Sequence, residues 1–139
     1  MAISQCMVTS FKVEILTGDQ DLLVDTLKIA LYTSAASLDA NTTTYTTSGE
    51  VSGAGYVAGG NTLTGTTVSS SGTTAIVSFN NTSWESAVFT ARGALIYNSS
   101  KANKAIAVLN FGTDQSVSVG TFTIQFPTAN AASAIIRIA

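Results

Sequence analysis

The sequence contains no histidine, a single cysteine, Cys6, and a single proline, Pro127. Nucleophilic catalysis by a Ser–His–Asp or Cys–His group needs an imidazole base, which this chain cannot supply. Zinc and iron sites need several Cys or His ligands, so we expect no metal and no other cofactor. A lone cysteine cannot form an intramolecular disulfide, so Cys6 is expected to be a small apolar filler. These absences predict a protein that is not an enzyme.

Charge is also scarce, because charged residues make up 10% of the 139 positions, against about 25% in ordinary globular proteins. The six Lys and Arg residues are spread along the chain and the net charge is −2, so we expect no basic patch for a nucleic acid. No apolar run approaches the roughly 18 residues of a membrane span. The start, Met1–Val8, has no positive charge ahead of an apolar run, so we expect no secretory signal and synthesis in the cytoplasm.

Serine and threonine take the place of the missing charge, with 17 Ser and 21 Thr, so the polar surface is expected to consist of hydroxyls. Strand patterns dominate the rest of the chain. Apolar side chains alternate with others in Phe11–Ile15 and Leu27–Tyr32, as in half-buried strands. Further strands are predicted at Tyr56–Leu63, Thr66–Ser69, Ala75–Phe79, Ala87–Tyr97, Ala105–Phe111, Thr121–Phe126 and Ala134–Ile138.

Eight or nine short strands in one domain, residues 1–139, predict an all-β sandwich of two packed sheets. The strand count favours a jelly-roll-like arrangement, with an immunoglobulin-like sandwich as the alternative. The long stretch Ala87–Tyr97 contains Gly93, which predicts a bulge or bend, and a short helical turn is expected at Ser34–Asp39. Turn residues separate the strands most clearly at Asn80-Asn81, Asn98-Ser99-Ser100 and Gly112-Thr113-Asp114.

The segment Thr33–Gly55 is rich in Thr, Ser, Ala and Gly and has no clear apolar period. Such long connections are uncommon in compact domains. One interpretation is a mobile surface loop. The other is an extended arm that becomes ordered against a partner, which would bury Tyr45, Val51 and Tyr56.

Four other features have a structural interpretation beside a functional one. The acidic turn Thr17–Asp25 resembles a solvated hairpin turn more than a calcium site. The glycines of Gly53–Gly60 miss the spacing of nucleotide-binding loops and fit a bulge or a tight crossing. Trp84 is expected to be a core plug, with an interface anchor as the alternative. Arg92 is expected to form a structural ion pair, with Glu50 or Glu85 as its partner.

Four blocks carry a resemblance to a known group of proteins: Asp25–Ser34, Gly49–Gly60, Phe89–Asn98 and Phe122–Pro127. Together they resemble small structural proteins of tailed bacteriophages, in particular capsid decoration (cement) proteins. The resemblance implies a non-enzymatic virion protein on the capsid exterior that binds the major capsid protein and stabilises the head. It also implies many copies, as dimers or trimers at symmetry axes.

The alternative function is a carbohydrate- or receptor-binding module of a phage tail or head fibre, which the shortage of aromatic residues disfavours. No catalytic, cofactor-binding or metal-binding residue is expected under either function. The residues expected to contact a partner are Tyr45, Glu50, Val51, Tyr56, Trp84 and Arg92.

Overall fold

The computed structural model describes residues 2–139. Of the segment Met1–Val8, in which no secretory signal is expected, only Met1 lies outside the described residues. Two antiparallel sheets pack against each other, which confirms the predicted all-β sandwich. The larger sheet has the strand order β1-β7-β6-β2-β3, and the smaller has the order β4-β5-β8. The strands are β1 (Cys6–Met7), β2 (Leu27–Tyr32), β3 (Asn61–Thr62), β4 (Thr67–Ser71), β5 (Thr74–Ser78), β6 (Thr82–Asn98), β7 (Lys104–Ile124) and β8 (Ile136–Ile138).

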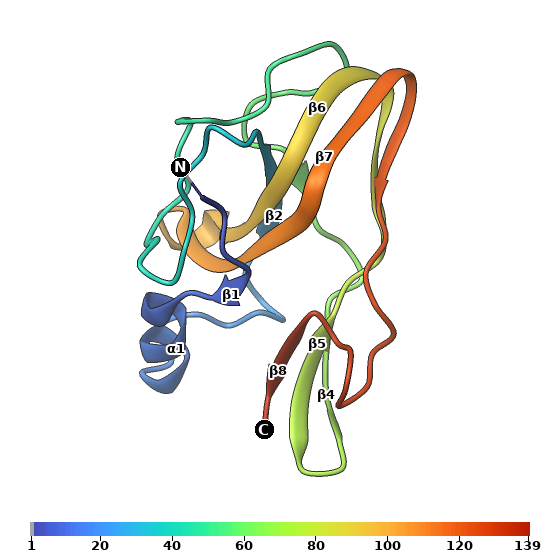
Figure 1. Cartoon of the computed structure of the whole chain (residues 1–139). Helices are drawn as coiled ribbons and strands as arrows, with labels where there is room; N and C mark the ends of the chain where they lie inside the picture. Colours follow the sequence, from blue (N-terminus) through green and yellow to red (C-terminus); the bar gives the residue numbers. More distant parts are fainter. Residues whose placement is uncertain (1) are drawn as a thin grey trace.

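The long hairpin of β6 and β7 forms the centre of the molecule (Figure 1). A short 3₁₀ turn, η1 (Ser99–Lys101), joins the two strands where the sequence predicts a turn. The strands then run side by side and bend together near Ser86 and Val119, which lie outside the regular pairing and have positive φ. Another register shift falls between Ala91 and Gly93, which confirms the predicted bulge.

The predicted break at Gly112-Thr113-Asp114 is wrong, because β7 continues through it as one strand. The pairing passes from Gly93–Asn110 directly to Ala91–Gln115, so β7 has extra residues here. The turn residues therefore form a large bulge in β7. Ala105–Phe111 and Thr121–Ile124, on either side of it, belong to one strand because both pair with β6.

The predicted strand at Phe11–Ile15 is also wrong, because these residues form the helix α1 (Thr9–Leu16). Phe11 is the buried residue of this helix, and Val8 is buried just before it. In a helix Phe11 and Ile15 lie on the same face, four residues apart. Burial of Phe11, together with contact between the helix and β7, decides the conformation, since a five-residue alternation fits either structure.

Two smaller predictions also fail. Only Asn61–Thr62 of the predicted strand Tyr56–Leu63 is a strand. The expected helical turn at Ser34–Asp39 is a simple turn, closed by a 3.1 Å hydrogen bond from the Ala36 N–H to the Thr33 carbonyl. No helix within residues 2–139 is long and apolar enough to cross a membrane.

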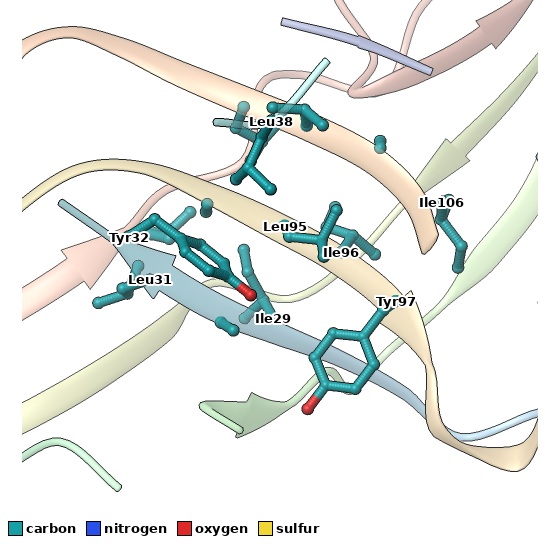
Figure 2. Close-up of a cluster of buried hydrophobic side chains, with 14 of the residues drawn as sticks. Ile29, Leu31, Tyr32, Leu38, Leu95, Ile96, Tyr97 and Ile106 are labelled. Carbon is teal, nitrogen blue, oxygen red and sulfur yellow. The ribbon is translucent and has the colours of Figure 1, made fainter. Parts of the chain in front are cut away.

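The main hydrophobic core lies around β2 and β6, which pair with Ile29 opposite Ile96 and Ala30 opposite Leu95. Both faces of β2 are covered, so nearly all of its side chains are buried. Leu38, from the long segment after β2, belongs to the same cluster as the strand residues (Figure 2). The segment after β2 is therefore part of the core.

Candidate interaction surface

A groove of about 310 Å³ lies where α1 and the following turn meet the smaller sheet. Strand pairing places Val68 opposite Val77, and Val77 opposite Ile136, so these side chains share one face of the sheet. A smaller hollow beside Leu16 continues the groove past Ile15 and Ile138. The groove is lined by Phe11, Ile15, Gly18, Gln20, Asp21, Leu22, Leu23, Val68, Ala75, Val77, Ile136 and Ile138. We call this surface, together with Leu16, the apolar groove.

Large apolar side chains are exposed at the apolar groove. Leu16 is 86% exposed and Leu23 is 61% exposed, and Val68 and Ile138 are also exposed. Val13 and Val24 are exposed on the same helix and turn. Six of the nine large exposed apolar residues in the described chain therefore lie on α1, on the turn that follows it, or on the smaller sheet. Single exposed apolar residues are normal, whereas a gathering of this kind is unusual on the free surface of a monomeric protein.

A polar network holds the turn that carries Leu22 and Leu23. Gln20 and Asn98 are both buried, and the Asn98 amide donates to Gln20 Oε1 at 3.1 Å and to Asp25 Oδ2 at 2.7 Å. Gln20 in turn donates to Glu14 of α1 at 2.9 Å. The turn is therefore anchored to the end of β6. This corrects the expectation of a solvated hairpin turn at Thr17–Asp25, since the turn follows a helix and packs on the sheet.

Lys104, the first residue of β7, strengthens this anchor from the other side. Its ammonium group bonds to Asp19 and lies 3.6 Å from Glu14. The hydrogen bond from Lys104 lowers the pKa of Asp19, and the same bond raises the pKa of Lys104. Within residues 2–139, no cluster of three His, Cys, Asp or Glu residues has the geometry to hold a metal ion.

Three of the predicted partner-binding residues come together away from the apolar groove. The half-buried Glu50 accepts hydrogen bonds from the hydroxyls of Tyr45, at 2.6 Å, and Tyr56, at 2.5 Å. It also accepts one from the backbone N–H of Gly59, at 2.8 Å. Tyr45 stacks on Tyr97 with ring centroids 4.8 Å apart. All three acceptor contacts of Glu50 are thus internal to the chain.

The same cluster covers the outer edge of β2. The Tyr56 hydroxyl accepts a hydrogen bond from the Leu31 N–H at 3.0 Å, in place of a neighbouring strand. The Val51 N–H donates to the Leu31 carbonyl at 2.9 Å, and Val51 and Tyr56 are both buried. The chain itself buries these two side chains, so the expectation that a partner must bury them is wrong.

The four tyrosines surrounding Glu50 are held as neutral donors. Burial is the largest cause of the raised pKa of Tyr32, Tyr45, Tyr56 and Tyr97, and for Tyr97 the pKa reaches about 12. The Glu50 carboxylate raises the pKa of Tyr45 and Tyr56 further, because both hydroxyls donate to it. This cluster locks residues 45–59 onto the sheet.

Trp84 and Arg92 also have partners within the chain. Trp84 is buried between Tyr56 and Phe122, with ring centroids 6.1 Å away in each case, and its Nε1 has no hydrogen-bond partner. Arg92 lies 3.3 Å from Asp114 on the neighbouring strand. The prediction of an ion pair for Arg92 is therefore right in kind, but its predicted partners, Glu50 and Glu85, are wrong.

Sequence reasoning missed the residues of the apolar groove. One local signal was present, since Leu22, Leu23 and Val24 form an apolar triplet between Asp21 and Asp25. Leu22 is buried in the core, whereas Leu23 and Val24 stay exposed in this otherwise polar turn. The other wall, with Val68 and Ile138, has no local signal because it arises only when the smaller sheet packs beside α1.

Comparisons with family models, with curated proteins and with solved structures found no match to this chain. The apolar groove and the resemblance in the sequence blocks are therefore the two observations from which a function is proposed.

Proposed function

We propose that this protein is a non-enzymatic capsid decoration protein of a tailed bacteriophage, which binds the outside of the major capsid protein lattice. The observation that carries the proposal is the apolar groove, an exposed apolar surface on a protein whose other surfaces are rich in hydroxyls. The resemblance of Asp25–Ser34, Gly49–Gly60, Phe89–Asn98 and Phe122–Pro127 to decoration proteins supports the same function.

Binding at the apolar groove would be driven by removal of apolar surface from water. Each fully buried Leu or Val side chain contributes about 1.5–3 kcal/mol. Leu16 and Leu23 would contribute most of this gain, and Val68 and Ile138, which are already about half buried, a smaller part of it. Many copies attached to one shell then stabilise it by mass action, because a ligand that binds only the assembled state favours that state.

The low charge of the protein suits this mode of binding. The net charge is −2, and Glu14, Asp19 and Lys104, which hold the turn beside the apolar groove, already pair with one another. The ionisable residues that line the surface itself are Asp21 in the groove and Lys12 in the adjoining hollow. Few charges would lose hydration when the groove is covered. Binding to the shell should then depend only weakly on salt concentration, since salt screens charges and leaves apolar burial intact.

The proposal is tested on particles prepared with and without the protein. Particles that carry it should retain packaged DNA to a higher temperature, and adding purified protein back to particles that lack it should restore the higher threshold. The measurement is DNA release during heating, followed by a dye that binds free DNA. Equal release temperatures for the two kinds of particle would count against a decoration function.

A second candidate, a saccharide- or receptor-binding module, is favoured by one specific hollow. Phe111 and Phe122 lie beside Gln115 and Gln125 in an open hollow of about 310 Å³ on β7. Aromatic faces with neighbouring amides suit a sugar ring, which offers C–H faces and hydroxyls. Immunogold labelling of virions distinguishes the two functions, because label over the whole head supports decoration and label at the tail supports adhesion.

A further inference from the structure

We propose that two copies of this protein pair through the free edge of β4, which joins their smaller sheets into one. The β4–β5 hairpin extends from the body of the molecule, with β8 on the other side of β5 (Figure 1). Within residues 2–139, no strand pairs with the outer edge of β4. Its outward backbone N–H and C=O groups are therefore available to another chain.

The other edges of the molecule are poor templates for pairing. β1 and β3 each have two residues, and β8 has three. The outer edge of β7 is interrupted by the bulge near Gly112 and by the bend at Val119. Bulges of this kind protect an edge from pairing. By contrast, β4 has five residues in unbroken register, from Thr67 opposite Ser78 to Ser71 opposite Thr74.

The β4 edge also lacks the residues that normally prevent edge pairing. Natural sheets protect free edges with Lys, Pro or inward-pointing charges. No charged residue occurs between Glu50 and Glu85, and the one proline is Pro127. The edge carries Thr67, Val68, Ser69, Ser70 and Ser71, of which all but Ser71 are exposed. Nothing in this strand repels a second copy.

The strand is self-complementary when a two-fold axis passes through Ser69. Antiparallel pairing then places Ser69 opposite Ser69, Val68 opposite Ser70, and Thr67 opposite Ser71 of the second copy. This chain already joins strands by hydroxyl pairs of that kind. The hydroxyls of Ser83 and Thr123 lie 2.9 Å apart across β6 and β7, and those of Thr90 and Ser116 lie 2.8 Å apart. A second copy is therefore the partner that the edge fits.

The dimer has a consequence for the apolar groove. The two-fold axis of an antiparallel strand pair is perpendicular to the sheet, so the same face of each sheet looks the same way in both copies. Val68 and Ile138 lie on the groove face of the smaller sheet. Pairing through β4 thus places both grooves on one side, where a single shell could cover both.

The first test is the mass of the protein in solution by sedimentation velocity, up to about 1 mM. The unaltered protein should form a dimer. Ser69→Lys places two ammonium groups opposite each other and should weaken the dimer at least roughly tenfold, because like charges directly opposite are unfavourable. Ser69→Glu alone should behave in the same way. An equimolar mixture of the two variants should dimerise again.

Two results would overturn the proposal. One is an unaltered protein that stays monomeric or forms trimers, and the other is a Ser69→Lys variant that dimerises normally.

A second test does not depend on weakening the dimer. Ser69→Cys in a Cys6→Ser background places two cysteines directly opposite each other, with Cβ atoms about 5 Å apart across the axis, which a small shift brings within reach of a disulfide. Mild oxidation should cross-link this variant quickly, whereas Ser118→Cys, an exposed position on β7, should cross-link slowly. Equal rates would contradict the β4 interface. A monomer that still binds shells would overturn the dimer and leave the decoration function standing.

Discussion

At the residue scale, Glu50 and the tyrosines surrounding it couple the conformation of the long segment to protonation. Tyr45 and Tyr56 can donate to the Glu50 carboxylate only while their hydroxyls are protonated. The sequence shows each of these residues, and Tyr45, Glu50 and Tyr56 are among the six residues predicted from it to contact a partner. It could not show that they contact one another within the chain, because Tyr97 and Gly59 complete the cluster from other elements.

This cluster predicts unfolding in alkali. All four tyrosines have a folded-state pKa above the usual value of 10.0, and that of Tyr97 reaches about 12. Their contribution to stability is complete below pH 10, where the unfolded chain also keeps its protons. It is lost as the pH rises above 10 through the folded-state pKa, since the unfolded state releases protons first. Phenolate absorbance and far-UV circular dichroism should therefore change together above pH 10. Tyrosines that ionise near pH 10 while the fold stays intact would contradict the cluster.

At the element scale, the sequence predicts strands best where both faces of the strand are buried or where turn residues bound it. Leu27–Tyr32 is predicted with its observed limits, but the expectation of a half-buried strand is wrong, because both of its faces are covered. Phe11–Ile15 is predicted wrongly, because helix α1 has no capping side chain and depends on the burial of Phe11 in the folded protein. The bulge at Gly112 is missed for a related reason, since only the partner strand β6 shows that β7 continues.

The long segment Thr33–Gly55 is the element whose predicted behaviour changes most. The Thr43 carbonyl accepts from Ala105 and the Tyr45 N–H donates to Asn103, both at 2.9 Å, so this part of the segment pairs with the start of β7. Removing residues 41–47 should therefore lower the free energy of unfolding by at least roughly 2 kcal/mol. The deletion leaves backbone groups of Asn103 and Ala105 without hydrogen-bond partners and exposes Tyr97. Urea unfolding measures this change. A deletion variant as stable as the unaltered protein would show that the segment is a dispensable loop.

At the scale of the whole molecule, the apolar groove lies between α1 with the turn that follows it and the smaller sheet, which is far from them in the sequence. Helix α1 and the Leu22–Leu23 turn form one wall, and Val68 and Ile138 form the other. Such a surface could not be predicted from local patterns, whereas the all-β class could, because alternation and turn residues are local. The proposed β4 dimer would double this surface without any new contact between the grooves.

The central claim is that the apolar groove makes the contact with the shell, and co-sedimentation with empty capsid shells tests it most directly. Leu16→Ser combined with Leu23→Ser removes two exposed side chains, so folding should be nearly unchanged. Val57→Ser is the control, because Val57 is 78% exposed but lies outside the groove. The double variant should bind shells at least about tenfold more weakly, since each buried Leu contributes about 1.5–3 kcal/mol, and Val57→Ser should bind normally. A double variant that binds as tightly as the unaltered protein would contradict the claim.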